Sequence, residues 1–191
     1  MIIELTRPFS YLWIRHSSKR LTVVNWFIPS GCSLAAIFIG WLLPGSIDVF
    51  GPTGILSKIL AFVQSLPGFY IAALAAVATF NNPHMDRAMP GEAPTLRILH
   101  NGELTPQPIS LTRRRLLCVM FAFLTVASVV LTVMAIGSLT VAPLIKDLLP
   151  TQLYAPAKLV FSGLYLLLFF QMLCVTMWGL FYIGERMLTP D

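Results

Sequence analysis

Charged residues are scarce in this sequence of 191 residues. Only 11% are Asp, Glu, Lys or Arg, whereas 57% are hydrophobic, and the mean hydropathy is +0.79. Soluble domains carry about 25% charged residues, so a soluble chain this apolar would lack the polar surface needed to cover itself. The scarcity of charge excludes an ordinary soluble domain and favours an integral membrane protein.

Ionisable side chains are missing from the middle of the apolar runs, although ion-coupled transporters and proton relays depend on them. The histidines, His16, His84 and His100, are far apart. His84 and Asp86 together supply only two of the three or four ligands of a zinc site. No nucleophile elbow, phosphate loop or paired-carboxylate pattern occurs. We therefore expect no enzyme activity, no catalytic residue, no metal and no cofactor.

Cysteine is limited to Cys32, Cys118 and Cys174, and all three fall in apolar runs. An odd number without metal-ligand spacing indicates neither a disulfide framework nor a metal site, so we interpret them as packing residues. A cleavable signal peptide is also not expected. Residues 1–20 contain five charged side chains and no apolar segment before a small-residue cleavage site.

Four apolar runs are long enough to cross a hydrocarbon core, which takes roughly 20 helical residues. They are about Leu21–Leu43, Ile55–Phe80, Leu116–Pro143 and Leu159–Ile183. The sequence therefore predicts an all-α integral membrane protein with four transmembrane helices in two hairpins.

The basic residues predict the orientation of these helices. Ten of the 13 Lys and Arg residues, including every arginine, fall in the N-terminal arm, the central loop or the C-terminal tail. The other side carries only Lys58, Lys146 and Lys158. Because short cytoplasmic loops are enriched in Lys and Arg, we expect both termini and the central loop in the cytoplasm (N-in/C-in). Basic residues flanking the helices are expected to contact anionic membrane lipids rather than nucleic acid.

The predicted layout has five segments. They are an interfacial N-terminal arm (1–20), a first transmembrane hairpin (21–80), a cytoplasmic loop of 35 residues (81–115), a second hairpin (116–184) and a cytoplasmic tail (185–191). In the arm, Phe9, Leu12 and Trp13 are expected on the apolar side of a short helix lying on the membrane.

Two prolines interrupt the first predicted hairpin. Pro29 and Pro67 each remove a backbone N–H from an apolar run and predict a kink. The kinks fit either a hinge or cavity, or ordinary irregularity in membrane helices. Gln64 and Gln171 are the long polar side chains at depth, and they fit either hydrogen bonds between helices or a polar constriction in a pore.

Small residues recur every four positions in the second run. Gly68, Ala72 and Ala76 lie on one helical face, where small side chains let two backbones approach closely. We predict that this stripe contributes to self-association.

The central loop, "NNPHMDRAMPGEAPTLRILHNGELTPQPISLTRRR", contains five prolines, which exclude a helix through most of it. Alternating Leu96, Ile98 and Leu104 around Asn101-Gly102 predict a short β-hairpin. Acidic and basic side chains are interspersed along the loop, which suits a protein surface. The predicted partner-binding residues are Asp86, Arg87, Glu92, Arg97 and Glu103. The alternative is a loop that covers only the ends of its own helices.

The segment "AVATFNNPHMDRAMPGEAPTL", with Thr79, Phe80, Asp86, Pro90, Gly91 and Pro94, resembles the KwaA family, the membrane subunit of the Kiwa anti-phage system. The resemblance covers the four-span layout with its one long loop. It implies a non-enzymatic sensor and scaffold of the bacterial inner membrane. Such a protein oligomerises, as a tetramer, and recruits a soluble DNA-binding partner. The alternative function is a small oligomeric channel or membrane-disrupting effector activated on infection.

Overall fold

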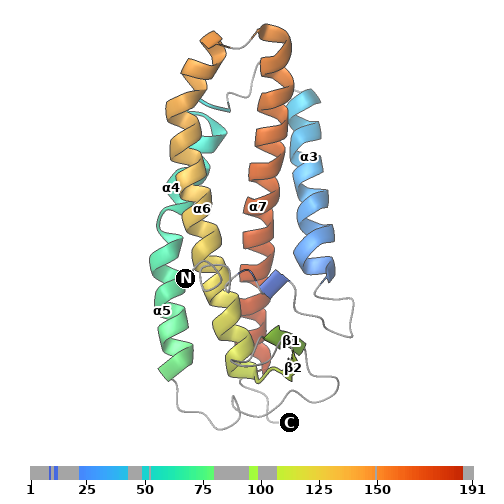
Figure 1. The fold of residues 1–191 in the computed structure, drawn as a ribbon, viewed down its shortest axis with the longest axis vertical. Helices are drawn as coiled ribbons and strands as arrows, with labels where there is room; N and C mark the ends of the chain where they lie inside the picture. Colours follow the sequence, from blue (N-terminus) through green and yellow to red (C-terminus); the bar gives the residue numbers. More distant parts are fainter. Residues whose placement is uncertain are drawn as a thin grey trace.

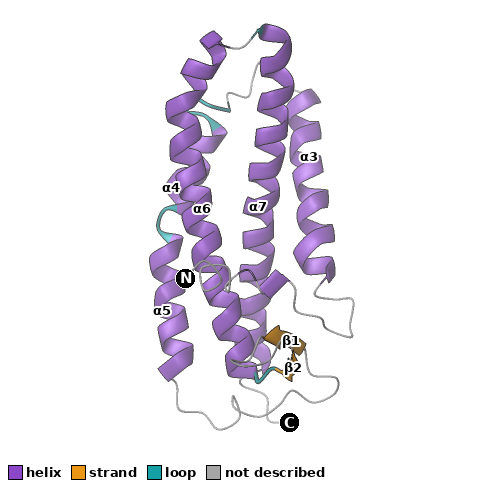
Figure 2. Cartoon of the chain, in the orientation of Figure 1, coloured by secondary structure: helices purple, strands orange, loops and turns teal. Residues whose placement is uncertain are grey.

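The computed structural model describes residues 9, 11–12, 22–42, 49–51, 53–79, 95–98, 107–148 and 150–186. Four helical segments in these ranges are long and apolar enough to cross a membrane, namely Val23–Leu42, Ile55–Thr79, Arg113–Ile145 and Gln152–Gly184. Helices dominate the described chain (Figure 2). The predicted helical, four-span character of the protein is thereby confirmed, at the level of helix length and composition.

The first span combines a π-helical turn, η2 (Val23–Phe27), with helix α3 (Ile28–Leu42). The second span is broken into α4 (Ile55–Val63) and α5 (Leu66–Thr79), and Gln64 and Ser65 form a turn between them (Figure 2). Both irregularities lie next to the prolines that predicted kinks.

The third and fourth spans are helices α6 (Arg113–Leu148) and α7 (Thr151–Arg186), each of 36 residues. At 1.5 Å per residue each is about 54 Å long, well beyond the hydrocarbon core of about 30 Å. Both helices exceed the predicted spans. Helix α6 already includes Arg113–Arg115, which the sequence placed in the loop, and most of the predicted loop between the last two spans is helical. Pro143 and Pro156 fall inside these helices without ending them.

The two central helices are α6 and α7, which pack against each other (Figure 1). Helices α4 and α5 pack along α6, and α3 packs along α7. The two spans of the expected first hairpin thus pack on different central helices, and the hairpin topology stays a prediction. Only residues 149–150 join α6 to α7, and a connection this short forces adjacency. Residues 43–54 are long enough to let the first two spans separate.

The buried core lies along α6. Leu117, Met120, Leu124 and Leu131 recur at helical spacing and are each no more than 1% exposed. Many other apolar side chains remain exposed on the outer faces, among them Phe27, Leu34 and Val160. An apolar exterior of this extent is what a lipid environment stabilises.

A small residue sets the contact between α3 and α7. A Cβ atom at Gly163 would lie 3.3 Å from Ile37 Cδ1, which is tighter than ordinary packing. The Ser33 hydroxyl donates a hydrogen bond to the Gly163 carbonyl over 3.2 Å. Glycine thus lets the two backbones approach closely enough for a polar contact between the helices.

Two short strands lie at the end of the bundle where α6 begins (Figure 1). Strand β1 (Thr95–Ile98) pairs antiparallel with β2 (Gln107–Ser110), and Ile98 lies opposite Gln107. A two-residue turn at Asn101-Gly102 would place Ile98 opposite Thr105. Because Ile98 pairs with Gln107 instead, the connection between the strands is two residues longer than that turn requires. The connecting residues 99–106 lie outside the described ranges, so the hairpin turn stays a prediction.

Candidate functional site

The predicted partner-binding residues fall mostly outside the described chain. Asp86, Arg87, Glu92 and Glu103 belong to the ranges whose structure is not described, and Arg97 is described only as a backbone position of β1, opposite Pro108. Their assignment to a docking face stays a prediction.

The start of α6 is built to hold basic side chains at the end of the bundle. Thr112 caps the helix, because its hydroxyl accepts a hydrogen bond from the Arg115 N–H over 3.3 Å. Arg114 Nη1 donates to the Ala78 carbonyl over 3.1 Å. That carbonyl belongs to the last turn of α5, where helix carbonyls lack intrahelical partners. Arg114 therefore ties the end of the second span to the start of the third.

Arg113 is the most buried of these basic residues, with 7% of its surface exposed. The adjacent Leu111 is fully buried. Cations in the first turn of a helix oppose the helix dipole, so helix stability alone does not explain three consecutive arginines there. The predicted enrichment of basic residues on the cytoplasmic side of a span is one explanation for them.

A buried polar junction joins the first span to α7. Pro29 has no N–H and so cannot bond the Asn25 carbonyl four residues earlier. Gln171 Nε2 donates to that carbonyl over 3.0 Å, and Gln171 is only 3% exposed. The π-helical turn lies directly before the proline, with the Ile28 N–H bonded to the Val23 carbonyl. The predicted role of Gln171 as a hydrogen bond between helices is thus confirmed.

The N-terminal arm contributes to the same junction. Tyr11 is 1% exposed, and its ring stacks on Phe123 of α6 at a centroid distance of 5.2 Å. Its hydroxyl lies 3.5 Å from Asn25 Oδ1 as donor. Burial raises the pKa of the Tyr11 phenol, so the proton for this bond stays in place.

The expected interfacial arm stays a prediction, because an exposed apolar side chain fits a lipid-facing position. Phe9 is 40% exposed, whereas Tyr11, which was not predicted, enters the core. The predicted apolar side of the arm did not include Tyr11, although the rings of Phe9 and Tyr11 both contact Phe123. The burial of Tyr11 could have been inferred from its hydroxyl, which can donate a hydrogen bond, and from Asn25 in the adjacent span, which can accept one.

A second polar contact joins α5 to α7. The oxygens of Tyr70 and Thr176 are 2.7 Å apart. Thr176 donates its single hydroxyl proton to the Met172 carbonyl over 2.7 Å, so Tyr70 is the donor to Thr176. Tyr70 is 1% exposed. This contact was not predicted, because a tyrosine near a proline kink carries no sequence signal for its partner.

Gln64 behaves differently from Gln171. It lies in the turn between α4 and α5, and its side chain is exposed on the outer surface. The structure shows no bond between helices for Gln64 among the described residues, so both predicted roles of Gln64 stay predictions. The physical reason is Pro67, which cannot donate to the Val63 carbonyl and ends the α4 hydrogen-bond ladder. The turn carries Gln64 outward.

The small-residue stripe lies on the outside of the monomer. Gly68, Ala72 and Ala76 are all exposed on α5, and no other heavy atom lies within 4 Å of a Cβ built at Gly68. The stripe is therefore not an internal packing face. Its use in self-association stays a prediction.

The described part of the chain contains few side chains of the kinds that support catalysis or bind a metal. No three His, Cys, Asp or Glu side chains gather there as a metal site. Cys32, Cys118 and Cys174 are free thiols, each half-buried. Comparisons with protein family models, curated proteins and solved structures find no match to the chain. The resemblance to the KwaA family stays a prediction.

Proposed function

We propose that this protein is a non-enzymatic, multi-pass membrane scaffold whose arginine-rich end docks a soluble partner protein. One observation carries the proposal. Arg114 bonds the Ala78 carbonyl of α5, Arg113 is largely buried beside it, and strands β1 and β2 lie at the same end (Figure 1). This end brings together three arginines, of which Arg115 is exposed, and a pair of strands, at the start of a helix long enough to cross a membrane.

The orientation follows from charge. Ten of 13 basic residues belong to the N-terminal arm, the loop 81–115 and the tail, which favours N-in/C-in insertion with the arginine-rich end in the cytoplasm. The loop 81–115, with its proposed β-hairpin, then faces a compartment where soluble partners are present. The remaining basic residues, Lys58, Lys146 and Lys158, belong to the opposite end.

The biological setting comes from the resemblance to the KwaA family. It supports a role in the bacterial inner membrane as a sensor of phage infection. It also supports a tetrameric assembly and a partner that itself binds DNA. The scaffold proposal stands without this setting, because it rests on the arginine-rich end and the loop beside it.

Capture of the partner tests the proposal. The tagged chain is purified from native membranes in parent form and with Asp86→Lys, Arg87→Glu, Glu92→Lys and Arg97→Glu combined. A matched control carries Lys58→Glu and Lys146→Glu at the opposite end. We expect one soluble protein to co-purify with the parent and the control but not with the loop variant, while insertion and oligomer size stay unchanged. Equal capture by the loop variant would refute the docking role.

Self-association is proposed through the exposed stripe on α5. Ala72→Leu or Ala76→Leu adds bulk where two backbones would approach, so we expect a smaller or shifted oligomer in mild detergent. Ala35→Leu, at an exposed position of α3, is the matched control. If both stripe variants cross-link and elute like the control, the stripe faces lipid and the interface lies elsewhere.

A channel between copies is the second candidate, and the exposed Gln64 favours it. A polar amide on the outer surface of a membrane span is costly in lipid, and in an oligomer it would face either a neighbour or a pore. Within one chain, the buried side chains of α6 fill the centre. Ion flux through liposomes that Gln64→Leu abolishes would support the channel. No flux from the parent would reject it.

A further inference from the structure

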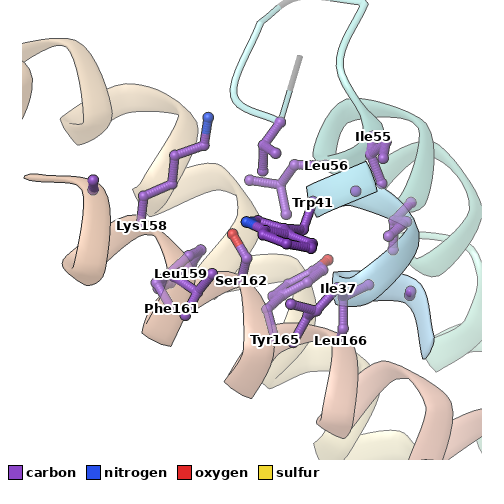
Figure 3. Close-up of a pocket in the computed structure, with 15 residues that line it drawn as sticks. Ile37, Trp41, Ile55, Leu56, Lys158, Leu159, Phe161, Ser162, Tyr165 and Leu166 are labelled. Carbon is purple, nitrogen blue, oxygen red and sulfur yellow. The ribbon is translucent and has the colours of Figure 1, made fainter. Parts of the chain in front are cut away.

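A cavity of about 350 Å³ lies between α3, α4 and α7, toward the end of the bundle opposite the arginines (Figure 3). Its walls are mostly apolar and include Ile37, Leu56 and Leu166. Ligand pockets in proteins begin at about this size. The cavity exists because α3 packs on α7 while α4 packs on α6, which leaves the space between α3 and α4 incompletely filled.

Two polar atoms in this cavity have no partner. The hydroxyls of Ser162 and Tyr165 are buried and make no hydrogen bond with the described residues, although Tyr165 is only 1% exposed. Both residues lie on α7, three positions apart, so their side chains share a face (Figure 3). A buried hydroxyl without a partner is unfavourable. Two such groups side by side indicate a site whose ligand supplies hydrogen-bond acceptors.

A cation, Lys158, lies one turn before Ser162 and two turns before Tyr165 on α7. Lys158 also lines the cavity, and its Nζ lies 5.8 Å from the centroid of the Phe50 ring. Among the described residues no carboxylate lies within ion-pair distance of it. Along α7 the rise is about 6 Å from Lys158 to Ser162 and about 10 Å to Tyr165. The fourth span begins at Gln152, and a lysine side chain can extend from within a span to the headgroups while the hydroxyls stay deeper.

We propose that the cavity binds one anionic phospholipid of the surrounding leaflet. Its phosphate lies beside Lys158, an ester carbonyl accepts hydrogen bonds from Ser162 and Tyr165, and one acyl chain fills the apolar space beside Leu166. A phospholipid carries these three features in this order along its length. Trp41 lines the cavity and is 73% exposed toward the lipid-facing exterior, which gives a lateral path of entry. The proposal is independent of the docking face.

Glycines on α3 provide a matched pair for the test. No heavy atom lies within 4 Å of a Cβ at Gly40 or at Gly31, so both positions tolerate a side chain. Only Gly40 lines the cavity. The full chain is placed in nanodiscs with a phosphatidylglycerol that carries a photoactivatable acyl chain, and the labelled peptides are identified. We expect labelling at residues 36–41 and 158–166 that Gly40→Leu abolishes and Gly31→Leu preserves.

A lysine pair tests the headgroup. Lys58 is exposed in α4 near the same end and does not line the cavity. In the parent, unlabelled phosphatidylglycerol should compete with the label better than phosphatidylcholine. Lys158→Met should reduce that preference about fivefold, because one lysine near anionic lipid contributes about 1 kcal/mol. Lys58→Met should leave it unchanged, and inorganic phosphate alone should not compete.

Three results would overturn the proposal. They are equal labelling of the Gly40→Leu and Gly31→Leu proteins, equal competition by the two lipids in the parent, and cross-links from this cavity to a second copy of the chain instead of to lipid.

Discussion

Tyr70 and Tyr165 are buried to the same extent, each 1% exposed, yet they differ in their partners. Tyr70 donates to Thr176, nearer the arginine-rich end, whereas Tyr165 has no partner and faces the cavity nearer the lysines. The same difference separates Gln171, bonded to Asn25, from Ser162, which is unpaired. The polar groups of Tyr70 and Gln171, toward the arginine-rich end, are thus hydrogen-bonded within the chain.

The comparison assigns different tasks to the two ends. Polar contacts toward the arginine-rich end join α7 to the first span, to α5 and, through Asn25, to the N-terminal arm, so that end is held by the chain itself. Toward the opposite end, the hydroxyls of Ser162 and Tyr165 are available to something outside the chain. A scaffold that docks a protein needs a fixed surface, and a lipid site needs unused polar groups.

The largest expected effect concerns the side of the membrane on which each end lies. A reporter inserted near Gly91 or fused at Asp191 should read as cytoplasmic, and one near Gly51 as periplasmic, because the basic residues cluster at the first end. The readout is all or none. A periplasmic signal at Gly91 would reverse the assignment of the two ends.

Removal of the Gln171 amide should destabilise the bundle more than any other single polar change discussed here. Gln171→Leu removes the amide that donates to the Asn25 carbonyl, which Pro29 cannot replace, and should lower the free energy of unfolding by about 1–3 kcal/mol. SDS titration in mixed micelles measures it. Gln64→Leu is the matched control, and its exposed position predicts no loss. Equal losses would show that the junction is not specific.

The two tyrosines should respond with opposite signs. Tyr70→Phe removes a contact between helices and should cost about 0.6 kcal/mol, the average for such bonds in a membrane. Tyr165→Phe removes an unpaired hydroxyl, so in detergent without phospholipid the stability should stay equal or rise. The same unfolding titration reports both. A loss at Tyr165 as large as that at Tyr70 would mean that its hydroxyl already has a partner.

The smallest effect is expected at Tyr11. Its hydrogen bond to Asn25 is long at 3.5 Å, so Tyr11→Phe should change stability by less than about 0.5 kcal/mol and retain the stacking on Phe123. Tyr11→Ala removes the ring as well and should cost roughly 3 kcal/mol or more. Similar losses for both variants would place the stabilisation in the hydroxyl instead.

The sequence predicted the spans well because their signal is local. Length and apolarity located all four helical segments within a few residues at most ends, and Pro29 and Pro67 marked both irregularities. The ends of α6 and α7 were missed, since a helix that leaves the hydrocarbon core no longer needs an apolar sequence. Helical bonding therefore continues through Lys146 and past Pro156.

Contacts between distant segments could not be predicted in the same way. Pro67 distinguishes the context of Gln64 from that of Gln171, but the partner of Gln171 depends on which neighbour faces its side chain. The separation of the first two spans, and with it the cavity, depends on two connection lengths. Residues 43–54 form a long connection, whereas residues 149–150 form a short one. Such choices depend on packing, which no single periodicity encodes.

Site-specific photocrosslinking in living cells tests most directly whether the two ends have different occupants. A photoreactive amino acid is placed at Arg97, in β1, and separately at Leu148, at the opposite end of α6. The account predicts a discrete adduct with a soluble protein at Arg97 and none at Leu148. An adduct with a soluble protein at Leu148, or none at Arg97, would contradict the assignment of the arginine-rich end as the docking face.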